Sequence, residues 1–286
     1  MSDAKISWDF CQKNSDDILN SGLEQLRLAK KYDSSHHSLS ATGNYVILFN
    51  DTPLYIGEAK DLKSRLKQQF YANTSTFFKS YVKKQSQLDI EKNLQVDNFE
   101  VKYVTTRVGR KELEEFGIVN FPTPLNKFQL GKRNNYRGLL KSDLWGKVQD
   151  EYFGIIESGG KAVIAAKPCN WLEATPLAKA GVYIVFNHKN EIIYIGESSN
   201  IGDRYKTHGK DTYFSAFRRN LGTNLLGFRL KERKGKKRYF EPNEDSQVDN
   251  YIRNCKIILK MINFGRFELE EYLIRNIQPV LNKKSK

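Results

Sequence analysis

The pattern of apolar and polar positions predicts two β-hairpins that lie far apart in the chain. The first covers residues 43–58, where an apolar run, a polar turn at 50–53 and a second short apolar run follow one another. The second covers residues 181–197, with its turn at 187–191. Aromatic and β-branched runs separated by Asn, Asp and Pro are typical of hairpin strands and their turns. Both regions are therefore expected to form sheet structure.

The two hairpins belong to a longer internal repeat. Each contains Tyr-Ile-Gly-Glu, starting at Tyr55 and at Tyr194, and an arginine follows ten residues later. The pattern Gly-Arg-x-Glu-Leu-Glu-Glu begins at Gly109 and again at Gly265, after strand-like runs, and an asparagine follows twelve residues beyond its second glutamate. The matched residues are Arg65 and Arg204, Glu114 and Glu270, and Asn126 and Asn282. Matched features in the same order indicate a duplicated module.

The repeat and the unmatched segments give the expected domain organisation. The fold class is α/β (α+β), with two modules related by pseudo-twofold symmetry. Each module is a small mixed or antiparallel sheet of about three strands flanked by helices. We expect a helical arm at 1–40, module 1 at 41–127, a connecting and DNA-contacting segment at 128–178, and module 2 at 179–286 with a basic insertion near 229–250. Gly159 and Gly160 are expected to break the connecting segment.

Charge indicates the kind of partner. The chain of 286 residues has 47 Lys and Arg against 33 Asp and Glu, a net charge of +14. Residues 1–127 carry 18 basic and 16 acidic side chains, whereas residues 128–286 carry 29 and 17. Such an asymmetric positive charge favours a polyanion such as nucleic acid. The alternative is a charged surface that serves solubility.

Other sequence features exclude several classes of protein. We see no apolar run near the roughly 20 residues that a membrane helix needs, and no secretory signal at the start. The three cysteines have no short spacing, which argues against a disulfide framework or a zinc knuckle. A reducing cytoplasm is the expected location.

The repeated residues suit phosphodiester hydrolysis. Mg²⁺ prefers oxygen ligands and often takes one or two carboxylates, so one glutamate per module suffices, whereas the His and Cys clusters of zinc sites are absent. Arginine matches phosphate oxygens with a planar fork, which suits Arg65 and Arg204 to transition-state stabilisation. Helix spacing predicts that Glu270 shares the core-facing side with Ile274 and Ile277, and it selects Glu270 over Glu271 and, likewise, Glu114 over Glu115.

The ordered set of Tyr, Tyr-Ile-Gly, Arg, Glu and Asn resembles the GIY-YIG endonuclease module, over 41–127 and 179–284. The resemblance implies hydrolysis of phosphodiesters with one divalent metal ion. It also implies that Tyr45 and Tyr183 are general bases and that Tyr55 and Tyr194 complete the sites. An ordinary tyrosine pKa near 10 leaves about one phenol in a thousand ionised at pH 7, so a base needs a lowered pKa. Core packing is the alternative role for a strand tyrosine.

His208 lies one helical turn after Arg204, where the first copy has Gln69. Some restriction enzymes of the resembled family have His at this position, which suggests that it supports the tyrosine or the attacking water. An idle surface histidine is the alternative.

Two basic segments are candidates for DNA contact. They are Arg229–Arg238 and Lys127–Lys141, and either could instead be a solvated loop. The candidate DNA-binding residues are Arg229, Lys231, Arg233, Lys234, Lys236, Lys237, Arg238, Lys132, Arg133 and Arg137.

These observations together predict a Mg²⁺-dependent DNA endonuclease, with Mn²⁺ as a substitute ion. One chain with two active sites suggests a restriction-like monomer that cuts both strands of double-stranded DNA. The alternatives are a structure-selective repair or recombination nuclease and a DNA-binding protein in which one or both sites are inactive.

Overall fold

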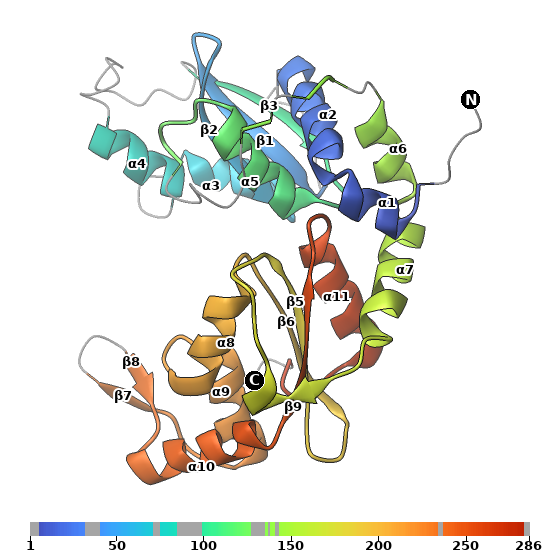
Figure 1. Ribbon diagram of the computed structural model, residues 1–286. Helices are drawn as coiled ribbons and strands as arrows, with labels where there is room; N and C mark the ends of the chain where they lie inside the picture. The colour runs from blue at the N-terminus through green and yellow to red at the C-terminus, as the bar shows by residue number, and fades with distance from the viewer. Residues whose placement is uncertain are drawn as a thin grey trace. The chain divides into compact units, whose positions relative to one another are not determined.

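The structure is a computed structural model that divides the chain into two compact units, residues 1–154 and residues 155–286 (Figure 1). It describes residues 6–31, 41–70, 75–84, 99–126, 135–136, 138–140, 143–233 and 237–282. This division differs from the expected one, because the first unit includes the N-terminal helices and the connecting segment is shared between the two units.

The first unit is built on a three-stranded antiparallel sheet with the order β2-β1-β3. Its strands are β1 (Gly43–Phe49), β2 (Thr52–Ala59) and β3 (Glu100–Thr105). Its helices are α1 (Trp8–Lys13), α2 (Ser15–Leu28), α3 (Leu62–Gln69), α4 (Thr76–Lys84), α5 (Arg110–Asn120) and α6 (Leu144–Asp150). The hairpin predicted from the sequence is confirmed.

Helices cover both faces of this sheet because its strands are apolar on both sides. Tyr45 and Ile47 lie in one core with Leu62 and Leu66 of α3. On the other face α5 contacts β2, and α2 packs on α5 and β3. The expected N-terminal arm is therefore part of the first unit's core rather than a separate element.

The second unit repeats this plan with a fourth strand, in the order β4-β9-β5-β6. Its strands are β4 (Cys169–Asn170), β5 (Gly181–Phe186), β6 (Ile192–Ser198) and β9 (Lys256–Met261), with a separate ribbon of β7 (Lys231–Arg233) and β8 (Lys237–Tyr239). Its helices are α7 (Tyr152–Ile164), which begins in the first unit, α8 (Ile201–Lys210), α9 (Ala216–Asn220), α10 (Pro242–Arg253) and α11 (Arg266–Ile277), with the 3-10 turn η3 (Trp171–Glu173) and the π-helical turn η4 (Leu221–Leu225).

Gly159 and Gly160 do not break the chain; they lie inside α7. A Cβ atom at Gly160 would lie 2.7 Å from the ring of Tyr272 on α11. Gly160 therefore leaves room for Tyr272, at a helix propensity cost of about 1 kcal/mol.

Local sequence determines where the key helices begin. The side chains of Asp61 and Asn200 accept hydrogen bonds from the third residue of α3 and α8, as the sequence predicted. Gly109 and Gly265 precede α5 and α11 with φ of 86° and 80°, a left-handed conformation that glycine adopts at low cost. These four positions fix where the arginine and glutamate candidates emerge beside each sheet.

Candidate active site

Two tyrosines from neighbouring strands form the floor of the candidate site in the second unit. Tyr183 of β5 lies opposite Gly196 of β6, and Tyr194 lies opposite Val185. The two tyrosine rings stack with centroids 6.1 Å apart. A Cβ atom at Gly196 would lie 2.2 Å from the Tyr183 hydroxyl, so the glycine of Tyr-Ile-Gly is what makes room for this hydroxyl.

His208 of α8 lies against the Tyr183 hydroxyl. Its Nε2 is 2.8 Å from that oxygen, and its Nδ1 is 2.7 Å from Oγ of Ser215. The ring is only 1% exposed. Burial, followed by the positive charges of Arg204 and Arg218, lowers the pKa of His208 to about 3. His208 is therefore a neutral buried side chain, and the idle surface histidine is excluded.

Arg204 and Glu270 act electrostatically on the same two tyrosines. Burial raises the pKa of Tyr183 well above its usual value; the neighbouring Tyr194 and the Glu270 carboxylate add to this, whereas Arg204 lowers it. The pKa of Tyr194 is also raised, first by burial and then by Glu270. The structure thus gathers two phenols, a guanidinium and a carboxylate. In these surroundings Tyr183 stays protonated. A general base would need a lowered tyrosine pKa, and the described side chains do not provide this.

Helix spacing grouped Glu270 with Ile274 and Ile277 as core-facing residues of α11, and the structure differs in which apolar residues are fully buried. The buried apolar residues of this helix are Leu269 and Leu273, whereas Ile274 and Ile277 are half-buried. Glu270 lies at the edge of this stripe, where its Oε1 accepts a hydrogen bond of 3.2 Å from the backbone N–H of Glu197.

A buried ion pair that was not predicted from the sequence lies next to the Glu270 carboxylate. Arg266, 2% exposed, donates from Nε to Oε2 of Glu197 over 2.9 Å. The signal was present in the sequence, because the Glu after Tyr-Ile-Gly and the Arg after Gly265 both occur in the two copies. Glu197 in turn orients Glu270 through its backbone N–H.

Arg219 is a second residue that was missed. Its Nη1 donates to the backbone carbonyls of Thr212 and Tyr213 at 3.0 and 2.5 Å. Burial and the nearby charge of Arg238 lower its pKa, and Tyr194 opposes this. Arg219 follows the helix-capping Ser215 by four residues, as Lys79 follows the capping Ser75 in the first unit. The repeat predicted from the sequence did not extend to this position.

Asn282 does not face the phenols through its amide. Its Oδ1 accepts from the N–H of Ile195 at 2.8 Å, and its Nδ2 donates to the carbonyl of the same residue at 2.7 Å. This pair of bonds holds the Tyr-Ile-Gly strand in place, so the geometry gives Asn282 a positioning role rather than contact with reacting atoms.

Comparison with known protein families identifies the fold around this cluster. Residues 163–286 match the GIY-YIG catalytic domain. The match indicates a nuclease domain that acts on DNA, and it contains every residue of the cluster described above. No curated protein matches the chain. The family match does not extend to residues 41–127, so a second module remains a prediction.

The first unit nevertheless has a side-chain cluster that resembles the one in the GIY-YIG domain, with Gln69 in the place of His208. Tyr45 and Tyr55 stack with ring centroids 6.2 Å apart. Gln69 donates from Nε2 to the Tyr45 hydroxyl, and its Oε1 accepts from Ser75 at 2.8 Å. Asn126 makes the same two bonds, at 2.9 and 2.8 Å, to Ile56 of β2.

Glu114 completes this first cluster. Burial, with contributions from Glu58 and Glu115, raises the pKa of Glu114 to about 7, against the lowering effects of Lys111 and Arg65. Glu58 is held by Nε of the buried Arg110 at 3.1 Å. Glu115 is 3% exposed, so helix spacing wrongly made it the more exposed of the two glutamates.

The predicted basic hairpin of the GIY-YIG domain forms the ribbon β7–β8. Arg229, Lys231, Arg233 and Arg238 are exposed. Lys231 pairs with Glu241 at 2.8 Å, Arg238 with Glu232 at 3.5 Å, and Arg233 lies 4.2 Å from the Tyr239 ring centroid. The remaining candidates, Lys132, Arg133, Arg137, Lys234, Lys236 and the side chain of Lys237, lie outside the described part of the chain.

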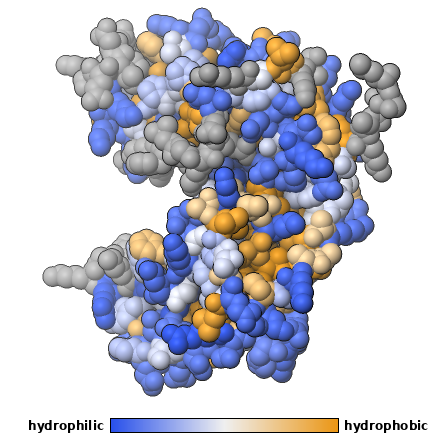
Figure 2. All heavy atoms as spheres, viewed as in Figure 1, coloured by the Kyte–Doolittle hydropathy of each residue, from blue (hydrophilic) through white to orange (hydrophobic). Residues whose placement is uncertain are grey.

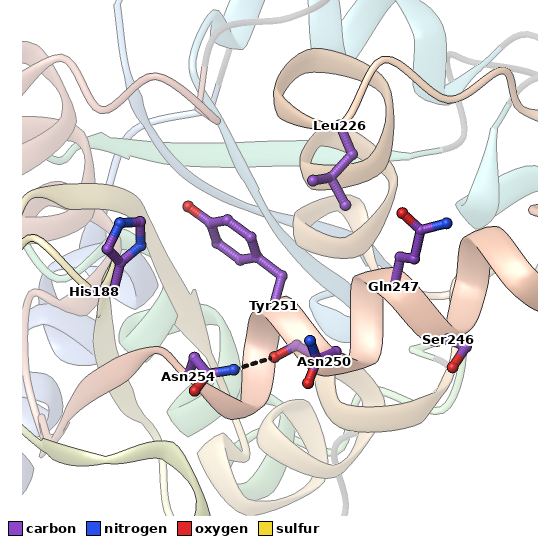
Figure 3. Close-up of a pocket in the computed structure, with 7 residues that line it drawn as sticks. All are labelled: His188, Leu226, Ser246, Gln247, Asn250, Tyr251 and Asn254. Atoms are coloured by element: carbon purple, nitrogen blue, oxygen red, sulfur yellow. Dashed lines mark hydrogen bonds between the residues drawn. The ribbon is translucent and has the colours of Figure 1, made fainter.

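A pocket of about 690 Å³ on the GIY-YIG domain involves none of these residues (Figure 3). Its lining comes mainly from α10 and includes Ser246, Gln247, Asn250 and Asn254 with Tyr251; Asn254 donates to the Asn250 carbonyl at 2.8 Å. His188 and Leu226 complete the lining, which contains no Lys or Arg side chain that would attract a phosphate. Among the described helices, none has the length and apolar character that crossing a bilayer requires.

Proposed function

We propose that the chain is a Mg²⁺-dependent DNA endonuclease of restriction-like type, in which two clusters each cut one strand of double-stranded DNA. Mn²⁺ would substitute for Mg²⁺. The observation that carries this proposal is the recurrence of one side-chain arrangement. In both units a strand tyrosine is hydrogen-bonded by the next helix, opposed by a glycine and accompanied by an arginine and a glutamate.

Corresponding backbone geometry supports an internal duplication. Tyr45 pairs with Gly57 in the first sheet as Tyr183 pairs with Gly196 in the second. In both sheets the first strand of the hairpin lies in the middle, between the second hairpin strand and the strand that precedes the last helix of the repeat. The orders are β2-β1-β3 and β6-β5-β9. A single chain with two such sites would act as a monomer in place of a symmetric dimer.

The donor atoms in the second cluster fit a hard cation. Glu270 offers a carboxylate, and the tyrosine hydroxyls supply further oxygen atoms. Among the described residues no group of three His, Cys, Asp or Glu side chains could hold a metal, which does not suit a closed zinc cage. Glu270 would hold Mg²⁺, which, when bound, supplies positive charge to the phosphate and lowers the pKa of a bound water.

The hydrogen bonds around His208 favour one tautomer. Oγ of Ser215 accepts from the N–H of Arg218 at 3.0 Å, so its own proton is directed to Nδ1 of His208. The Nε2 atom then carries the ring proton and donates to Tyr183. Gln69 supports this assignment, because its amide accepts from a serine and donates to a tyrosine in the same way.

A donor to the phenol oxygen stabilises the phenolate. We therefore assign the general base to Tyr183, with His208 as its hydrogen-bond donor and not as a proton acceptor. Arg204 would bind an oxygen of the scissile phosphate, and its charge opposes the burial that keeps Tyr183 protonated. Tyr45, Gln69, Arg65 and Glu114 would play these roles in the first unit.

Incubation with supercoiled plasmid tests the proposal. With Mg²⁺ we expect discrete linear fragments, and with EDTA no cleavage. Cuts confined to branched substrates would instead favour a repair or recombination nuclease. Binding that neither Mg²⁺ nor Mn²⁺ converts into cleavage would favour a DNA-binding protein with inactive sites.

A further inference from the structure

Two neighbouring aromatic side chains of the second unit face solvent beside the candidate active site. Phe214 is 64% exposed and Tyr213 is 37% exposed. Their rings contact each other edge to face, with centroids 4.6 Å apart. Such a pair costs hydrophobic free energy in water, whereas the next residue, Ser215, is fully buried.

The segment that carries these rings is held at several points. Arg204 donates from Nη1 to the Phe214 carbonyl at 3.3 Å, and Arg219 donates to the carbonyls of Thr212 and Tyr213. The N–H of Phe214 bonds to Oδ1 of Asp211 at 3.1 Å. These contacts fix the backbone, so the exposed rings are presented by an ordered turn.

Both arginines that hold the turn also belong to the tyrosine cluster. The charges of Arg204 and Arg219 lower the pKa of Tyr194, and the Tyr194 ring contacts Phe217 of α9, the helix that carries Arg219. If a phosphate were bound at Arg204, the neighbouring nucleotides would lie close to the turn at Tyr213 and Phe214, because successive nucleotides of one strand rise by about 3.4 Å. The bond from Arg204 to the Phe214 carbonyl puts the aromatic pair within reach of a nucleotide next to such a phosphate.

Surrounding charge favours the same occupant. Lys206 and Lys210 are exposed on α8, and Arg238 acts electrostatically on Arg219. Exposed aromatic rings among cations are the combination with which proteins bind unstacked nucleobases. In the view of Figure 2, much of the surface of the second unit is hydrophilic.

We propose that Tyr213 and Phe214 form a stacking tip that binds a nucleobase flanking the scissile phosphate. This proposal rests on the proposed function, since it takes Arg204 as the phosphate-binding group. The turn would stack on, or insert beside, a base partly removed from the helix stack, as apolar wedges do in proteins that kink DNA.

The test compares Tyr213→Ala/Phe214→Ala with Tyr213→Phe/Phe214→Tyr, which keeps both rings. The control is Leu225→Ala, which removes another exposed apolar side chain, 40% exposed, of the same unit. Each variant is titrated with a fluorescein-labelled 20-base-pair duplex and with its labelled single strand, in Ca²⁺ and low salt. Thermal unfolding verifies that the variants are folded.

We expect the alanine pair to weaken binding about tenfold to a hundredfold, most for the single strand, because stacking contributes on the order of 1–3 kcal/mol per base. The ring-exchange variant and the control should bind like the wild type. Equal binding by the alanine pair and the wild type would overturn the stacking tip, even where the wild type cuts plasmid. A wild type that binds through the tip yet never cuts with Mg²⁺ would retain the tip and overturn the nuclease proposal.

Discussion

At the scale of single residues, the most informative comparison is between His208 and Gln69. One is aromatic and titratable and the other is neither, yet both contact a buried tyrosine hydroxyl from one side and a helix-capping serine from the other. With the tautomer proposed above, what the two side chains share is a nitrogen that donates a hydrogen bond. Proton uptake by His208 is thus not required for the arrangement.

The first prediction follows from this shared nitrogen. His208→Gln should retain cleavage within about tenfold of the wild type, because the amide donates to Tyr183 as Gln69 donates to Tyr45. His208→Ala should lose about a hundredfold or more in kcat, the scale of general acid–base assistance. Rates of second-strand cleavage measure both variants. A glutamine variant as inactive as the alanine variant would contradict the donor role.

Acid pH provides a second prediction for the same residue. In the unfolded chain His208 takes up a proton near its ordinary pKa of 6.5, whereas in the folded unit burial lowers its pKa to about 3. The free energy of unfolding should therefore fall as pH drops through this window, by up to about 1.4 kcal/mol per pH unit. His208→Gln should lack this part of the slope. Urea unfolding at several pH values compares the two proteins, and identical slopes would refute the buried neutral histidine.

At the scale of secondary-structure elements, the sequence predicted those strands and helix starts that depend on neighbouring residues within each repeat. Both hairpins, the helix starts at Asp61 and Asn200, and the strands before α5 and α11 follow from local pattern. The missed features depend on contacts between distant segments. A strand was expected within residues 128–178, but the pairing of β4 with β9 was not. Nor were the bonds of the fully buried Arg218 to Asp245 and Asp249 of α10, at 2.7 and 2.6 Å. No periodicity within one segment carries that information.

The same limit explains the errors in helix faces. Spacing alone grouped Glu270 with Ile274 and judged Glu115 the exposed neighbour of Glu114. Which face of a helix becomes buried depends on the element that packs against it, and in the first unit α2 packs against α5. Glu270 and Glu114 nevertheless act electrostatically on Tyr183 and Tyr45, each raising the pKa of its tyrosine.

The prediction for elements concerns the segment that ends at Asn282. Replacing Asn282 by Ala removes both bonds to Ile195 and should lower the free energy of unfolding by about 1–3 kcal/mol. Asn282→Asp keeps the acceptor for the Ile195 N–H but loses the donor, so it should also destabilise. Asn276→Ala serves as control, since its side chain is exposed and bonds only its own helix at Tyr272. Equal stability of the Asn276 and Asn282 variants would contradict the positioning role.

At the scale of the whole molecule, the two units differ more in their additions than in their tyrosine clusters. The second unit adds β4, the basic ribbon and α10, and the connecting segment and second copy carry most of the net charge. The first unit adds α1, α2 and α6 around its sheet. DNA contact outside the clusters is thus expected to come mainly from the second unit, while hydrolysis is expected from both.

Independent sites lead to the last prediction. Glu270→Gln and Glu114→Gln each remove one proposed cation-binding carboxylate while keeping its shape, so each variant should convert supercoiled plasmid only to the nicked form. The double variant should leave plasmid intact but still bind it, because the basic ribbon is unchanged. Gel electrophoresis over a time course separates nicked from linear products, and Glu271→Gln, next to the proposed ligand, is the matched control. If Glu270→Gln abolished both incisions while Glu114→Gln cut like the wild type, the second unit would hold the only active centre and the duplicated nuclease would be wrong.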